Sequence, residues 1–172
     1  MTTDFIGQTL QPNDLADKII AAFQTKDFIS YRKLLLTAED YKEFLNDFFK
    51  ANHISESEQK EFADKEKHFA DSAEIQFQME FNRLLNKGVK LGIEWTQIKK
   101  AKFVFKDDKP VNSDKKYLSG HLNFIYKDTT YVIFGIEAIE LTSGYKISDI
   151  RTILKGRVKE YVEPDLLDDE DL

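Results

Sequence analysis

Apolar residues recur every three or four positions through the first part of the chain, which is the pattern of helices that bury one face. Three such segments follow one another and predict three amphipathic helices. Asn13 or Asp14 can cap the first, and Thr37 can cap the third. The third has the clearest stripe and is expected to pack in the core. The apolar positions are Leu15, Ile19, Ile20 and Phe23, then Phe28, Tyr31, Leu34 and Leu35, then Tyr41, Phe44, Leu45, Phe48 and Phe49.

A longer, more polar helix is predicted after these three. Ser55 and Glu58 match a capping box, and a helix that runs to Asn86 would have Gly88 as its C-cap. That is about 30 residues, or roughly 45 Å. Its apolar positions drift slowly around one face, so one long helix and two helices with a bend fit equally well. Because residues 56–67 are highly charged, only the later half is expected to lie across the sheet.

The spacing of apolar residues changes after Gly92 from 3.6 to 2, which is the mark of entry into a sheet. Four strands are predicted, with a tight turn at Lys127 and Asp128 and a hairpin at Ser143 and Gly144. Connections this short make neighbouring strands antiparallel. The predicted fold class is therefore α+β, with N-terminal helices in residues 13–88, one of them long, packed on a C-terminal four-stranded antiparallel meander in residues 98–154.

Composition adds an aromatic core and a separate tail to this picture. The chain of 172 residues has 14 Phe and 7 Tyr, so large aromatic side chains should fill one core in a single domain, residues 1–156. The net charge of −6 is concentrated at the end, because the last 13 residues hold seven acidic groups and no basic one. Residues 157–172 are predicted to be a disordered acidic tail, with a docking segment as the alternative. Without a clustered basic face, nucleic acid is not an expected partner.

The absence of cysteine and of long apolar runs excludes several classes of protein. There is no cysteine, and therefore no disulfide framework, thiolate zinc site or cysteine nucleophile. No stretch approaches the roughly 20 apolar residues of a membrane span, and Met1 to Phe5 do not begin a signal peptide. The sequence as written predicts a soluble cytoplasmic protein, or an exported one if a signal peptide has been removed.

The C-terminal strands resemble those of the NTF2-like and cystatin-like group. In many of those domains the last strand begins with a glycine, an aromatic residue and a lysine, as Gly144, Tyr145 and Lys146 do here. The stretch from Gly92 to Ile98 also looks like small bacterial proteins of this group that have no assigned function. The likeness covers roughly residues 80 to 153. Because the helices all precede the strands and one is unusually long, the cystatin-like arrangement fits better than the NTF2-like cone. The group includes pocket enzymes, ligand binders and interaction modules.

Polar residues on the predicted strands are the candidates for catalysis. A pocket enzyme of the ketosteroid isomerase kind, which the resemblance allows, would need a buried carboxylate and a tyrosine donor. The weak candidates are His121, Tyr117, Tyr131 and Asp149. A half-exposed sheet places polar residues on its solvent face without any catalytic role, and that explanation is the simpler one.

Other chemistry finds little support in the sequence. The three histidines, His53, His68 and His121, have no carboxylates at metal-ligand spacing, so no metal site is predicted. No Gly-x-Ser-x-Gly element and no glycine-rich phosphate loop occurs, and no cofactor is expected.

Surplus aromatic residues are the candidates for binding. Phe48 and Phe49, or Phe77 and Phe81, would line a groove for a small apolar ligand or for a helix of another protein, although core packing is the simpler explanation for them. The leading hypothesis is a non-enzymatic binding or protein-interaction domain of NTF2-like or cystatin-like type, of which a toxin-neutralising immunity protein is one form. A homodimer through the sheet is also considered. The alternative is a small pocket enzyme, an isomerase or hydrolase, that uses the strand Asp, His and Tyr groups.

Overall fold

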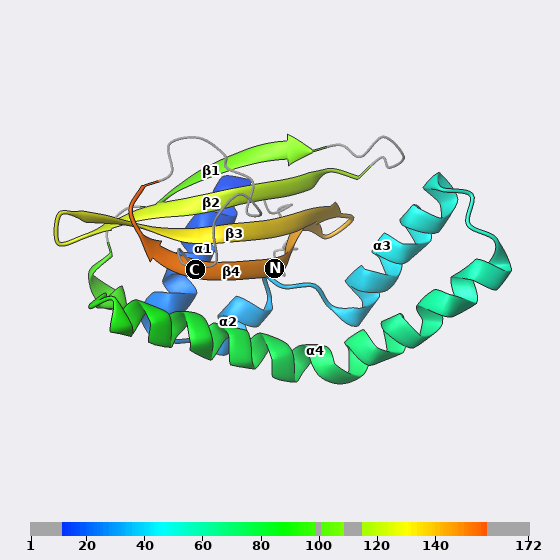
Figure 1. Cartoon of the computed structure of the whole chain (residues 1–172), viewed down its shortest axis with the longest axis horizontal. Coiled ribbons are helices and arrows are strands. Elements are labelled where there is room, and N and C mark those ends of the chain that lie inside the picture. Colours follow the sequence, from blue (N-terminus) through cyan, green and yellow to red (C-terminus); the bar gives the residue numbers. More distant parts are fainter. Residues whose placement is uncertain (1–11, 99–100, 109–114, 158–172) are drawn as a thin grey trace, which may run out of the picture.

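Four helices precede four strands in the computed structural model, which describes residues 12–98, 101–108 and 115–157. The arrangement confirms the predicted α+β class, with the helices first and the strands last (Figure 1). The predicted tail from residue 158 onward lies outside the described residues. The elements are α1 (Pro12–Thr25), α2 (Phe28–Arg32), α3 (Ala38–Ala51), α4 (Glu56–Lys90), a 3-10 turn (Trp95–Gln97), β1 (Ala101–Asp108), β2 (Tyr117–Tyr126), β3 (Thr129–Leu141) and β4 (Gly144–Lys155).

The strands form one antiparallel meander in the order β1-β2-β3-β4. The turn between β2 and β3 has positive φ at both Lys127 and Asp128, which matches the right-handed twist of the strands that it joins. Register shifts occur between Gly120 and Leu122 on β2 and between Glu137 and Ala138 on β3. The extra residue lies on β3 in the first case and on the edge strand β4 in the second, and such bulges bend a sheet locally.

The main core lies between this sheet and the helices α1, α2 and α4. In Figure 1, α1 passes behind the strands and the second half of α4 runs along β4. Aromatic side chains dominate the contact: the ring of Phe23 lies within 5.6 Å of the rings of Tyr31, Phe81 and Trp95, measured between centroids. The prediction of an aromatic core is confirmed. None of the described helices is long and apolar enough to cross a membrane.

The helix α4 is one continuous helix of 35 residues that curves along the body (Figure 1), so the choice between one helix and two is settled in favour of one. Its predicted capping box is present, since Ser55 and Glu58 each bind the other's backbone N–H through their side chains. The predicted C-cap at Gly88 is wrong. The helix continues to Lys90, and Gly92, with φ of +78°, follows its end.

A close approach of Trp95 explains why a glycine is needed at position 88. A Cβ atom there would lie 2.3 Å from Cζ2 of Trp95, so the indole can rest against the helix backbone only if no side chain is present. The helix ends in a Schellman motif, in which Ile93 N–H donates to the carbonyl of Gly88 and Gly92 N–H to that of Val89. At the other end of the helical region, α1 begins at Pro12, so Asn13 and Asp14 lie in its first turn and do not cap it.

The helix α3 and the first half of α4 form a helical hairpin that extends beyond the end of the sheet (Figure 1). We call this hairpin, residues 38–72, the arm, and the rest of the described chain the body. A seam of rings holds the arm together, with Phe62 of α4 lying 6.0 Å from Phe48 and 5.2 Å from Phe49 of α3. A small apolar cluster of Leu36, Ile139 and Leu141 packs where the arm meets the sheet.

Candidate functional site

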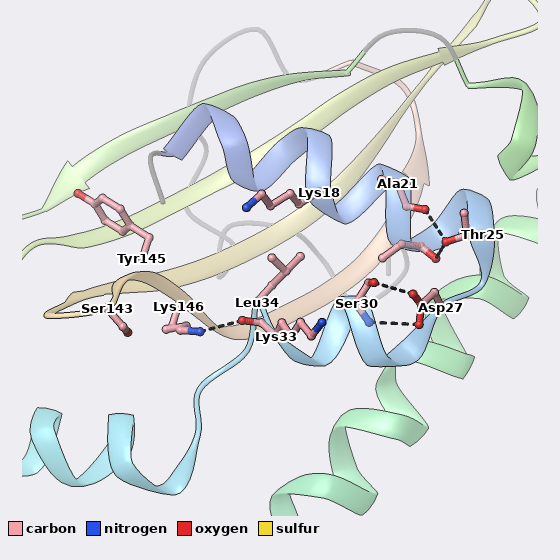
Figure 2. A pocket seen from close by; sticks show the side chains of 11 residues that line it. Lys18, Ala21, Thr25, Asp27, Ser30, Lys33, Leu34, Ser143, Tyr145 and Lys146 are labelled. Atoms are coloured by element: carbon pink, nitrogen blue, oxygen red, sulfur yellow. Dashed lines mark hydrogen bonds between the residues drawn. The ribbon is translucent and has the colours of Figure 1, made fainter. Parts of the chain in front are cut away.

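A cavity of about 590 Å³ lies between α1, the segment that contains α2, and the hairpin that joins β3 to β4. Lysines from three elements line it: Lys18 from α1, Lys33 from the end of α2, and Lys146 from β4 (Figure 2). We call it the lysine cavity. Its volume is within the range of sites that hold small molecules. The other lining residues are Ala21, Ala22, Thr25, Asp27, Ser30, Leu34, Ser143 and Tyr145.

Backbone pairing between a short segment and β4 brings two of these lysines to the same side of the cavity. After α2, Leu36 N–H donates to the carbonyl of Ile147 at 3.1 Å, and Ile147 N–H donates to the carbonyl of Leu34 at 2.8 Å. This parallel bridge places Lys33 and Lys146 next to each other, and Lys146 Nζ donates to the carbonyl of Lys33 at 2.7 Å. In Figure 2 the side chain of Lys18 lies on the opposite side, on α1.

The charge of the lysine cavity is positive. Its one lining carboxylate among the described residues, Asp27, is the N-cap of α2 and accepts from both the backbone N–H and the hydroxyl of Ser30, at 3.2 and 2.5 Å. Hydrogen bonds from the Ser30 hydroxyl and backbone lower the pKa of Asp27, so it remains an anion tied to the helix end. Within the described part of the chain, the ammonium groups of Lys18 and Lys33 have no hydrogen bond or salt bridge. Three cations therefore face one anion.

These groups suit binding better than catalysis. Lysine ammonium groups are mobile point charges that bind phosphate and carboxylate oxygens. The lining hydroxyls add hydrogen-bonding capacity, although that of Thr25 already donates to the carbonyl of Ala21 at 2.9 Å and that of Ser143 to Asp40 at 3.3 Å. Leu34 and the alanines of α1 provide an apolar wall. The described residues that line this cavity include no histidine, and their one carboxylate, Asp27, is engaged by Ser30.

The four predicted catalytic residues lie in different surroundings. His121 is fully buried, its ring stacks on Phe134 at 4.2 Å, and its Nδ1 accepts from Gly135 N–H at 3.2 Å. The expectation that this position faces solvent is wrong, because β2 is covered on both faces there. Tyr131 is buried in the core, Tyr117 is half-buried near the arm, and Asp149 is exposed on β4.

The four residues are also far apart in the register of the sheet. Tyr131 is opposite Phe124, Tyr117 opposite Ile139, and Asp149 opposite Glu137. None of them lines the lysine cavity or either of two other hollows in the described part of the chain. Within that part there is also no group of three His, Asp or Glu side chains that could hold a metal ion.

The predicted binding candidates divide between the body and the arm. Phe77 and Phe81 are buried in the core and offer no open groove. Phe48 and Phe49 are half-buried in the seam of the arm. Phe49 also lines a hollow of about 480 Å³ at the tip of the arm.

Glu80 carries a half-buried carboxyl that the sequence reasoning did not single out. Burial is the main cause that raises its pKa to about 7. A hydrogen bond from the Tyr31 hydroxyl at 2.9 Å acts to lower this pKa, while the charge of Asp149 raises it and that of Arg83 lowers it. The pKa of Tyr31 is also raised well above its usual value, by burial and by the charge of Glu80. A sequence signal existed, because Glu80 falls on the apolar stripe between Phe77 and Leu84.

Comparisons of this chain with protein-family models, with curated proteins and with solved structures find no match.

Proposed function

We propose that this protein is a non-enzymatic binding domain that holds a small anionic molecule in the lysine cavity. One observation carries the proposal: the cavity is lined by Lys18, Lys33 and Lys146, which come from three separate elements. Among the described residues that line it, the one carboxylate, Asp27, is already hydrogen-bonded to Ser30. The proposal keeps the ligand-binding hypothesis of the NTF2-like and cystatin-like resemblance. It places the site away from the face of the sheet that the helices fill with core side chains.

The expected ligand carries phosphate or carboxylate groups and a small apolar part. Each exposed lysine contributes about 0.2–1 kcal/mol to a contact with an anion, so three together give modest affinity that weakens as salt is added. The apolar wall of Ala22 and Leu34 would favour a molecule larger than a bare ion.

Isothermal titration at low ionic strength tests the proposal, with inorganic phosphate, citrate and adenosine monophosphate as probes. The expected result is saturable binding of at least one probe, weakened by about twofold to thirtyfold in a Lys18→Gln, Lys33→Gln variant, as two contacts of about 0.2–1 kcal/mol each predict. A Lys60→Gln, Lys67→Gln variant removes the same charge from the exposed surface of the arm and should bind as the native chain does. Absence of binding by all three probes, or equal losses in both variants, would reject the proposal.

A further inference from the structure

The outer face of α4 carries an exposed stripe without charge. Ile75, Met79 and Val89 are 66%, 66% and 61% exposed, which is unusual for large apolar side chains. Asn82 and Asn86, also exposed, lie between them. The five positions follow the alternating spacing of four and three residues that forms the contact seam of two-stranded helical coils. We call these five residues the α4 stripe.

The rest of α4 does not need this stripe for folding. Its opposite face packs into the core through Phe77, Phe81 and Leu84. In Figure 1 the second half of α4 forms the outer boundary of the body, away from the sheet. The exposed positions beside the stripe mostly carry charged or amide side chains. The α4 stripe, with five uncharged residues of which three are large and apolar, therefore stands out as a distinct surface.

We propose that the α4 stripe docks a second copy of the chain, with the two α4 helices antiparallel about a two-fold axis at Asn82. The two ends of the stripe lie at equal distances from this residue, because Ile75 precedes it by seven positions and Val89 follows it by seven. An antiparallel pair therefore places Ile75 against the partner's Val89 at both ends. It also places Asn82 against its own copy, where the two amides can bond and fix the register.

Charge favours the antiparallel direction over the parallel one. Asp71 and Glu74 lie at the start of the stripe, whereas Lys87 and Lys90 lie at its end. Antiparallel helices bring each acidic end near the partner's basic end and also oppose the two helix dipoles. Parallel helices would place like charges together at both ends.

The size of the contact predicts a weak dimer. A single pair of helices buries less than the roughly 1,200 Å² of a standard interface, and two of the five stripe positions are polar. The outward curvature of α4 limits the contact further. We therefore expect dimers to form only as the protein concentration rises toward the millimolar range.

Cysteine cross-linking tests both the surface and the direction, because the native chain has no cysteine. Helix axes about 8–10 Å apart bring the two copies of residue 82 to within about 4–6 Å between Cα atoms, a distance that a disulfide spans. An Asn82→Cys chain should thus form disulfide-linked dimers on mild oxidation. In an Asn86→Cys chain the two thiols would be about 12 Å apart along the helix and should link much more slowly. A mixture of Gln78→Cys and Asn86→Cys chains should link to each other.

Sedimentation equilibrium provides the second measurement. A Met79→Glu chain should remain monomeric at concentrations where the native chain associates, whereas Ser57→Glu, at the tip of the arm, should not change the association. Circular dichroism of each variant checks that the helices are retained. Faster linking through residue 86 than through residue 82, or a native chain that stays monomeric, overturns the proposal. A dimer that forms without linking through residue 82 also overturns it and leaves the sheet as the alternative interface.

Discussion

The body and the arm use the same kind of side chain in different ways. In the body, Phe81 is 2% exposed and contacts the rings of Phe23, Phe28 and Tyr31. In the arm, Phe62 is half-buried and lies against two rings of a single neighbouring helix. The arm is also acidic, with ten acidic and five basic residues between positions 38 and 72. The difference indicates that the body sets the global stability and that the arm opens more easily.

The largest test of this difference is the removal of one ring from each region. Phe81→Ala should lower the free energy of unfolding by about 3–5 kcal/mol, because it leaves a cavity in the main core. Phe62→Ala should cost only about 1–2 kcal/mol, because part of its ring is already exposed to water and it packs against one neighbouring helix. Urea unfolding followed by circular dichroism measures both values. Equal losses would show that the arm is as firmly packed as the body.

The next largest effect is expected from Glu80, a residue of the body, which should make the free energy of unfolding depend on pH. Its pKa in the folded chain is raised to about 7 from 4.5, so the folded state holds a proton that the unfolded state has lost. Stability is therefore highest below about pH 4.5 as far as this group is concerned, and falls as the pH rises toward 7 and above, by at most about 3 kcal/mol.

The Glu80→Gln variant isolates this contribution. Glutamine still accepts the hydrogen bond of the Tyr31 hydroxyl but does not ionise, so the variant should lose the decline between about pH 4.5 and 8. Glu61→Gln, an exposed change on the arm, is the control and should keep the native profile. The measurement is the unfolding free energy across this pH range. If the free energy of unfolding changed with pH in the same way for the native chain and for Glu80→Gln, the raised pKa of Glu80 would be contradicted.

Local patterns were enough to predict the type and order of the elements, but the expectation that α3 packs in the core was wrong, because α3 lies in the arm with only Leu45 of its apolar stripe buried. The capping box at Ser55 and the turn at Lys127 and Asp128 are formed by residues that are close in sequence, so their signals are complete in the chain itself. The end of α4 was misplaced because Gly88 makes room for Trp95, a contact that periodicity does not reveal. His121 alternates correctly on its strand but is buried on the face that alternation assigns to solvent.

The lysine cavity could not be predicted in this way. Lys18, Lys33 and Lys146 are spread over most of the chain, and only the bridge between Leu35 and Ile147 brings two of them together. Lysines are common on any protein surface, and their spacing here matches no motif. Glu80 is the opposite case, since its place on an apolar stripe is enough to mark it from the sequence alone as an acid at the edge of the core.

The smallest expected effect concerns the junction between arm and body. Glu43 on α3 accepts from Lys115 Nζ at 2.8 Å and from the backbone N–H and hydroxyl of Thr142, both at 2.9 Å. Burial acts to raise the pKa of Glu43, but these hydrogen bonds outweigh it and hold the pKa below its usual value. The carboxylate therefore stabilises the junction above its unfolded pKa, and this contribution is lost as the pH falls through the lower folded value.

Glu43→Gln should weaken this junction by about 0.5–1 kcal/mol, the usual value of a partly exposed ion pair. The loss should be local, because the core does not depend on it. Hydrogen exchange should show faster exchange in α3 and unchanged exchange in β2 and β3, and Glu39→Gln on the exposed side of α3 should show neither change. If the sheet strands exchanged faster as well, the arm and the body would unfold as one unit, and the contrast between them would be one of packing alone.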